Sequence, residues 1–272
     1  MSFKIALDAG HYLKTPGKRC LKKLDPNETR EWVLNDRVAR HFAEAAGQYE
    51  GVEILRVDDV TGAKDVSLKN RCRAANAWDA DLYLSIHHNA GINGGSGGGI
   101  VAYSYKENSV GAAYRDAIYS ACVAAGGLVG NRAEPKQAYG FYVLKNTDAP
   151  AVLMEYGFMD SKADVPVILT EAYAKAMAIA TMEAIAHEAK LGVKKPAVVE
   201  KKPTASVELP VLQRGDKGDA VKVMQTLLTM RGFDCDVDGS FGPATKQQLQ
   251  AFRPGDGICD GAAWEALLGV GT

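Results

Sequence analysis

The chain has 272 residues, of which 47 % are hydrophobic, and its 32 basic and 33 acidic side chains give a formal net charge of −1. This length suffices for one substantial domain and one small satellite domain. Near-neutrality, without a basic stripe interleaved with aromatic residues, argues against a nucleic-acid-binding protein, and the sequence has no apolar run long enough for insertion into a membrane.

The N-terminal segment predicts a buried strand that ends at a histidine. KIALDAG, Lys4 to Gly10, is a short apolar run that stops at a glycine turn, and His11 is the first side chain beyond it. Because the sequence begins at once with strand residues, we expect a protein made in the cytoplasm without a signal peptide.

The next element is an amphipathic helix that begins at a carboxylate. Residues 31–47 (EWVLNDRVARHFAEAAG) place their apolar side chains at near-helical spacing, and Gly47 marks the end. Glu31 lies in the first turn, where the helix dipole favours an anion. Glu28 is the nearest alternative, but Glu31 leads directly into the helix. We therefore take Glu31 as the candidate metal ligand.

Two further strands carry polar residues at or near their ends. DLYLSIH, Asp81 to His87, ends on a histidine, and PAVLMEYGF, residues 150–158, carries Glu155 behind four apolar residues. His88 should point to the opposite face of the sheet from His87, because strand side chains alternate, so we interpret it as a structural or supporting residue. A buried Glu155 without a partner would be destabilising, so we expect it to be neutralised, paired or close to a metal.

Strands that alternate with helices predict an α/β fold with a twisted, mostly parallel sheet flanked by helices. Ligands bind where the carboxyl ends of such strands meet, so we expect His11, Glu31, His87 and Glu155 to converge there. Two imidazoles and one carboxylate leave a Zn²⁺ ion one open position for water, as in catalytic zinc sites. Glu155 would then act as the base. Each residue alone has an ordinary structural explanation, and their combination favours a hydrolase.

Five motifs follow one another in the same order as in a known enzyme family. They are LDAGH, the helix that begins at Glu31, SLKNRCRAANAWDADLYLSIHHNA, GGSGGGIVAYSY and AVLMEYGFMD. Over about residues 1 to 190 the chain resembles the zinc-dependent N-acetylmuramoyl-L-alanine amidases of the Amidase_3 type. The resemblance implies zinc held by His11, Glu31 and His87, with Glu155 as the catalytic carboxylate. It also implies cleavage of the amide between N-acetylmuramic acid and the L-alanine of the peptidoglycan stem peptide.

Three further residues match the motifs of this family, and the residues after His11 depart from them. Arg71, Asn76 and Asn89 fall on family motif positions, where we take them as supporting contacts. Tyr12 and Leu13 follow His11 where the family often has Gly-Gly, so we expect a differently shaped rim beside the metal.

The C-terminal part predicts a linker and a small helical domain. A helix over residues 170–189 is followed by residues 193–208, rich in Lys, Pro and small residues, which predict a semi-extended linker. Residues 209–272 predict three helices and resemble peptidoglycan-binding modules of the PG_binding_1 type, with a shortened FRPGDGICDG stretch before the third helix. The implied organisation is a catalytic domain over residues 1–192, tethered to a module that brings it to the wall polymer.

Two other functions stay open. A zinc peptidase that cuts within the stem peptide would use the same metal and base. A non-catalytic wall-binding protein with a decayed site is opposed by the presence of all three ligands and Glu155. The expected lack of a signal peptide suits a phage or prophage endolysin that reaches the wall after release, with a host autolysin or a sporulation enzyme as alternatives.

Three remaining features receive structural interpretations. Residues 91–99 (GINGGSGGG) read as a flexible connection, because no Lys-Ser/Thr pair at a helix start follows to bind phosphate. The tyrosines at 103, 105, 139 and 142 alternate with apolar residues, which favours packing at a sheet edge over stacking on a sugar. The five cysteines lack metal-ligand spacing and are expected as free thiols, with Cys235 and Cys259 as a pair that could form after release.

Overall fold

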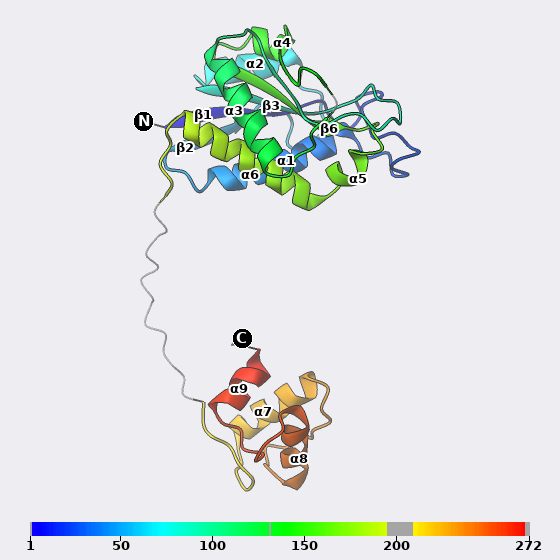
Figure 1. Ribbon diagram of the computed structural model, residues 1–272. Coiled ribbons are helices and arrows are strands. Elements are labelled where there is room, and N and C mark those ends of the chain that lie inside the picture. The colour runs from blue at the N-terminus through cyan, green and yellow to red at the C-terminus, as the bar shows by residue number, and fades with distance from the viewer. Residues whose placement is uncertain (1, 131, 195–208, 270–272) are drawn as a thin grey trace. The chain divides into compact units, whose positions relative to one another are not determined.

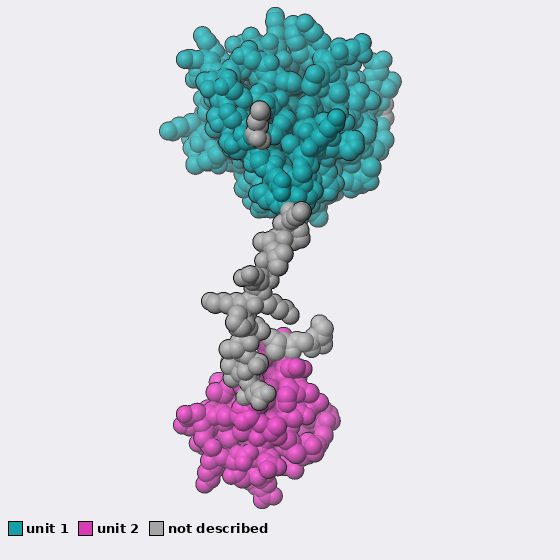
Figure 2. All heavy atoms as spheres, turned by 90° about the vertical axis from the view of Figure 1, so that its left-hand side faces the viewer, with its two compact units in different colours: residues 1–198 teal, residues 199–272 magenta. Residues whose placement is uncertain are grey.

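The computed structural model describes residues 2–130, 132–194 and 209–269, and the chain divides into two compact units, residues 1–198 and 199–272 (Figure 2). The linker expected over residues 193–208 lies outside the described residues from 195 onward. Its first two residues belong to the first unit, because Val193 forms a β-bridge with Tyr49 and the Lys194 N–H donates to the Gln48 carbonyl at 2.8 Å.

The first unit is built on a six-stranded sheet in the order β2-β1-β3-β6-β4-β5. Every neighbouring pair of strands is parallel except β4 and β6, which are antiparallel. This confirms the predicted α/β fold with a mostly parallel sheet. The strands are β1 (Phe3–Ala9), β2 (Val52–Arg56), β3 (Leu82–Asn89), β4 (Val101–Ser104), β5 (Lys136–Ala138) and β6 (Ala151–Phe158).

Helices cover both faces of this sheet (Figure 1). On one face, α1 (Glu31–Ala46), α3 (Val110–Ala124) and α6 (Glu171–Glu188) pack against each other and against the strands. On the other face lie α2 (Leu68–Ala77) and the short α4 (Tyr142–Lys145), while α5 (Val165–Ile168) is a single turn after β6. Both faces are thus buried, which explains why the strands read as continuous apolar runs.

Strand alternation decides which core each side chain joins. In β3, Leu84 and Ile86 enter the larger apolar cluster with α1 and α6, whereas Tyr83 enters the smaller cluster with α2 and α4. The same alternation sends His87 and His88 to opposite sides of the sheet, as predicted.

The described part of the second unit, residues 209–269, contains the three helices that the sequence predicted: α7 (Asp219–Met230), α8 (Pro243–Phe252) and α9 (Gly261–Leu268). They enclose a small apolar core that includes Met224, Leu249 and the fully buried Trp264. The buried Gln225 side chain ties α7 to the following turn, since it donates to Asp238 Oδ1 at 2.9 Å and accepts from the Gly239 N–H at 2.8 Å.

All five cysteines lie in described parts of the chain, where each is buried and free, so Cys235 and Cys259 form no disulfide in this structure. Within the same parts, no helix combines the length and the apolar character that crossing a membrane requires.

Candidate metal centre

His11 is held in an uncommon backbone conformation at the carboxyl end of β1. Its φ of 67° lies in the left-handed region, which costs a non-glycine residue about 1–3 kcal/mol unless its surroundings enforce it. The Arg71 side chain does so: its Nη2 donates to the His11 carbonyl at 2.9 Å and its Nη1 to the Ala9 carbonyl at 3.0 Å. The guanidinium from α2 thus fixes the turn that presents the His11 ring.

Arg71 is in turn fixed by a buried carboxylate on β1. Arg71 and Asp8 are 2 % and 1 % exposed and form an ion pair, and Asp8 Oδ2 also accepts from the Tyr83 and Ser85 hydroxyls, each at 2.9 Å. Burial alone would raise the pKa of Asp8, but the neighbouring Arg71 guanidinium holds it below its usual value. The network therefore stays ionised and rigid beneath the site.

Glu31 brings the two histidines together. Its Oε1 lies 3.0 Å from His87 Nδ1 and 3.4 Å from His11 Nε2. The two imidazole rings are nearly perpendicular, with centroids 4.9 Å apart. One potential ligand atom from each of the three residues falls within 4.8 Å of the other two. The structure thus places the three predicted ligands in one cluster, although the first and the last of them, His11 and His87, are 76 positions apart in the sequence.

Gly10 makes room for the His87 ring. A Cβ built on Gly10 would lie 2.0 Å from His87 Cε1 and 2.2 Å from Nε2, far inside van der Waals contact. Glycine is therefore required at this position by close approach, and not by its backbone angle. The His87 ring can lie directly against the Gly10 backbone because Gly10 has no Cβ.

Asn35 is a residue of the site that the sequence reasoning missed. It follows Glu31 by one turn of α1 and is fully buried. Its Nδ2 donates to the Gly10 carbonyl at 3.0 Å, and its Oδ1 accepts from His88 Nδ1 at 2.8 Å. Asn35 therefore joins the ends of β1 and β3. A polar residue four positions after Glu31, on the apolar face of the predicted helix, was the available signal.

His88, whose ring lies on the opposite side of the sheet from that of His87, also supports Glu31. Its backbone N–H donates to Glu31 Oε1 at 3.3 Å, and burial lowers the pKa of its ring to about 3, so the ring is neutral. This is the supporting position expected from strand alternation.

Glu155 stands beside His87 on the neighbouring strand. The two residues are paired in register across β3 and β6, so their side chains leave the same face of the sheet. Glu155 Oε2 is buried and has no hydrogen-bond partner among the described residues. Burial raises the pKa of Glu155 to about 8, and the negative charge of Glu31 adds to the rise.

The surroundings shift the pKa values of the Glu31 and Glu155 carboxylates in opposite directions. Burial would raise the pKa of Glu31, but its hydrogen bonds to His11 and His87 hold it well below its usual value. Glu155 is left protonatable near neutral pH, while Glu31 remains an anion. Opposite shifts in two neighbouring acids are typical of sites in which one acid handles protons and the other stabilises positive charge.

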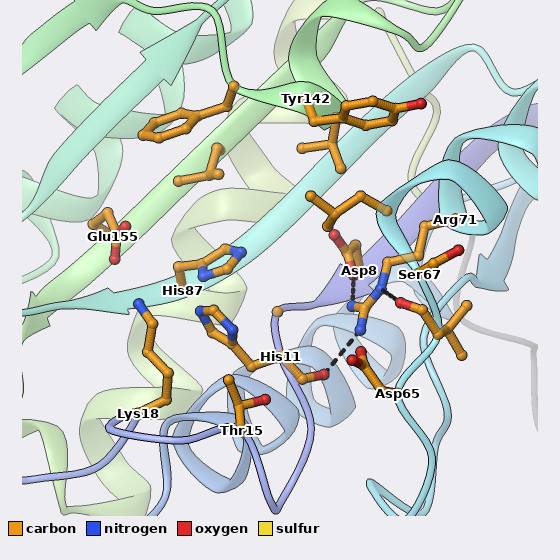
Figure 3. Close-up of a pocket in the computed structure, with 16 residues that line it drawn as sticks. Asp8, His11, Thr15, Lys18, Asp65, Ser67, Arg71, His87, Tyr142 and Glu155 are labelled. Atoms are coloured by element: carbon orange, nitrogen blue, oxygen red, sulfur yellow. Dashed lines mark hydrogen bonds and ion pairs between the residues drawn. The ribbon is translucent and has the colours of Figure 1, made fainter.

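A pocket of about 410 Å³ opens onto these residues (Figure 3). His11, His87, Lys18 and Glu155 line one part of it, and apolar side chains such as Leu68, Phe141 and Leu153 line much of the rest. A substrate in this pocket would reach the histidines and Glu155 together.

The cluster fits a divalent metal ion by its donor chemistry. Two imidazole donors and one carboxylate match the ligands that Zn²⁺ prefers in catalytic sites. Glu31 Oε2 is buried and lacks a hydrogen bond among the described residues, and its ion pair with Lys18 Nζ is long, at 3.5 Å, so this anionic oxygen can still accept a cation. A buried carboxylate oxygen without a hydrogen bond is rare in folded proteins unless an ion or water satisfies it.

Other positions singled out from the sequence lie around the site or away from it. Asn76 accepts from the Asp148 N–H at 3.1 Å and so fixes the loop before β6, while Asn89 Oδ1 accepts from the Ala90 N–H at 2.8 Å. We expected the glycine-rich segment to be a flexible connection, but hydrogen bonds hold it in place. The Asn93 N–H donates to the Asp160 carboxylate and the Gly99 N–H to the Asp164 carboxylate, each at 2.7 Å.

Tyr103 and Tyr139 pack together at the edge of the sheet as predicted, whereas Tyr105 lies beyond the end of β4 and is exposed. Tyr103 packs edge-on against Tyr139, with ring centroids 6.3 Å apart, and Phe141 joins them. The strand-like interpretation of Tyr142 is wrong, since this residue opens α4 and its ring lines the pocket. The Lys145 N–H donates to the Phe141 carbonyl at 3.1 Å, and this helical turn overrides the local alternation.

Comparison with known proteins places the first unit among amidases. The sequence profile of Amidase_3, described as N-acetylmuramoyl-L-alanine amidase, matches residues 5–187. The chain is 33 % identical over 179 residues to a sporulation-specific N-acetylmuramoyl-L-alanine amidase of Bacillus subtilis (strain 168), covering 64 % of each protein. It is 31 % identical over 197 residues to an endolysin of Bacillus phage SPP1, covering 69 % of this chain and 66 % of the endolysin. The chain thus spans just under two thirds of these relatives.

Solved structures support the fold. The crystal structure of an N-acetylmuramoyl-L-alanine amidase from Clostridium difficile 630 superposes with a TM-score of 0.62 at 22 % identity, over 70 % of this chain and 97 % of that one. At this identity the likeness concerns the fold of the first unit.

Proposed function

Because the chain belongs to the Amidase_3 family of N-acetylmuramoyl-L-alanine amidases, we propose that it is a zinc-dependent hydrolase of peptidoglycan. The bond cleaved is the amide between the lactyl group of N-acetylmuramic acid and the L-alanine of the stem peptide. The observation that carries the proposal is the convergence of His11, Glu31 and His87 beside Glu155 at one pocket.

His11, Glu31 and His87 would hold the zinc ion. When bound, zinc lowers the pKa of a water ligand towards neutrality and polarises the carbonyl group of the substrate. The protein's part is to fix the three side chains before the ion arrives. Arg71 fixes the His11 turn, Gly10 admits the His87 ring, and Asn35 and His88 support the strand ends and Glu31.

Glu155 would move the proton. Its carboxylate takes a proton from the attacking water and returns it to the departing amine of L-alanine. A carboxyl group whose pKa lies near the working pH can do both, and such acid–base help contributes about 10²–10⁴-fold to the rate. Burial next to the apolar stretch of β6 raises the pKa of Glu155 into this range.

The second unit would bind the same polymer. The resemblance of residues 209–272 to PG_binding_1 modules supports this role. The loop between α8 and α9 is shorter than in those modules, so the position of the ligand-binding groove is to be found by titration with wall fragments. A tethered wall-binding module raises the local concentration of the catalytic unit at an insoluble substrate. For the biological setting we propose a phage or prophage endolysin, supported by the match to the SPP1 endolysin over 69 % of this chain.

Digestion of purified wall material, with and without a chelator, tests the reaction. The proposal requires new amino termini on L-alanine and free lactyl carboxyl groups, both abolished by the chelator and restored by Zn²⁺. New termini on another stem residue would mean a peptidase, and an absence of any new terminus would mean a wall-binding protein without activity. Cleavage that persists in chelator would remove the metal from the reaction.

A further inference from the structure

Lys18 touches the ligand carboxylate from the loop between β1 and α1. Its Nζ lies 3.5 Å from Glu31 Oε2, and its backbone carbonyl accepts the Glu31 N–H at 3.1 Å. The loop is pinned at this point, because the Cys20 N–H donates to the Thr29 carbonyl at 2.8 Å. Lys18 is therefore held against the first residue of α1 by its main chain as well as its side chain.

The same side chain also faces the pocket. Lys18 lines it together with His11, His87 and Glu155, and Figure 3 shows its amine pointing towards the two imidazole rings on the side of Glu155. Burial dominates the raised pKa of Glu155, and the positive charge of Lys18 acts in the opposite direction. The ammonium thus acts electrostatically on both carboxylates of the site.

A cation at the histidine cluster would compete with this ammonium. Both are attracted to Glu31, whose side chain is 1 % exposed, and two positive charges a few ångströms apart repel each other. The Lys18 side chain is 42 % exposed, so it has room to turn, while its pinned backbone keeps it on the pocket wall. Once it leaves Glu31, the ammonium stands beside the place where a substrate amide would meet Glu155.

We propose that Lys18 is a further catalytic residue, whose ammonium yields Glu31 to the metal and then stabilises the negative charge that develops on the oxygen of the scissile amide. The inference rests on the proposed amidase function. As the water oxygen bonds to the carbonyl carbon, the π electron pair of C=O moves onto oxygen, and it returns as the C–N bond breaks. One water proton passes through Glu155 to the departing nitrogen, and Lys18 keeps its own protons throughout. A positive group that already stands beside the developing oxyanion lowers the barrier without moving in that step.

The test compares Lys18→Met and Lys18→Gln with wild type in two measurements, Zn²⁺ affinity by competition with a chromogenic chelator and steady-state cleavage of soluble muramyl peptides. Removal of the competing charge should leave Zn²⁺ affinity unchanged or tighten it by several-fold. At saturating zinc, kcat should fall about 10–100-fold, less than the loss of a buried oxyanion donor because the group is partly exposed, and KM should change little. Lys18→Arg should recover most of kcat, and Lys14→Met, an exposed lysine in the same loop, should behave as wild type.

Wild-type kcat in both neutral variants would overturn the proposal. So would a fall in kcat that follows a fall in Zn²⁺ affinity, because Lys18 would then merely support Glu31. Failure of the amidase function itself looks different, since the wild-type protein would then bind no zinc or release no L-alanine amine, and the proposal would fall with it.

Discussion

Gly10→Ala tests how the fold builds the site, because it adds one methyl group in the middle of it. The new Cβ would lie 2.0 Å from His87 Cε1, whereas carbon atoms in contact normally stand about 3.5 Å apart or more. Either the ring or the backbone must move by about 1.5 Å. The backbone is restrained on both sides, since the Gly10 N–H donates to the Ile86 carbonyl at 2.9 Å and the Gly10 carbonyl accepts from Asn35 at 3.0 Å.

The His87 ring should therefore give way. Metal–ligand distances are fixed to about ±0.2 Å, so a shift of this size removes a ligand. We expect Zn²⁺ affinity to fall by at least about 100-fold, beyond the usual cost of disturbing a residue that only supports a ligand. Overpacking of this kind costs about 1–3 kcal/mol in stability, so the variant should still fold.

The assay is zinc binding by chelator competition, with thermal unfolding followed by circular dichroism on the same samples. Gly140→Ala is the matched control, because a Cβ at Gly140 meets nothing within 4 Å. A Gly10→Ala variant that binds zinc as tightly as wild type would refute the reasoning, since the packing of Gly10 on His87 would then be unimportant for the metal site.

Three further substitutions probe other parts of the site. Glu155→Gln should keep zinc and wall binding but lose about 10²–10⁴-fold in turnover, measured as released L-alanine amine; an active Gln variant would mean that the base is another group. Asn35→Leu leaves the Gly10 carbonyl and His88 Nδ1 without partners and should cost about 2–5 kcal/mol in urea unfolding, with weaker zinc binding; a loss below about 0.5 kcal/mol would contradict the bridging role. Arg71→Leu leaves the buried Asp8 charge without its ion pair and the His11 carbonyl without its hydrogen bond, so we expect about 3–5 kcal/mol of destabilisation; an unchanged unfolding midpoint would show that the ion pair is dispensable.

The sequence allowed the sheet and the convergence of the site to be predicted for a physical reason. Apolar runs that end in His11 and His87 mark strands buried on both faces, and parallel strands bring their carboxyl ends to one edge. Glu31 was identified because an amphipathic helix has a recognisable start, and the structure begins α1 at that residue.

What the sequence could not predict depends on contacts between distant segments. The left-handed conformation of His11 is enforced by Arg71, which lies 60 positions away and belongs to α2. Lys18 lies in a loop without periodicity, so nothing local indicates that it approaches Glu31. Tyr142 alternates with apolar neighbours as a strand residue would, but the turn that follows Phe141 is helical.

Anomalous diffraction from crystals of the full chain grown with Zn²⁺ tests the central claim most directly. We predict one strong zinc peak per chain in the first unit, about 2.0–2.2 Å from a nitrogen of His11, a nitrogen of His87 and an oxygen of Glu31, with a coordination position open towards the pocket. A first unit whose zinc lies elsewhere, or in which these three side chains turn away from one another, would contradict the account.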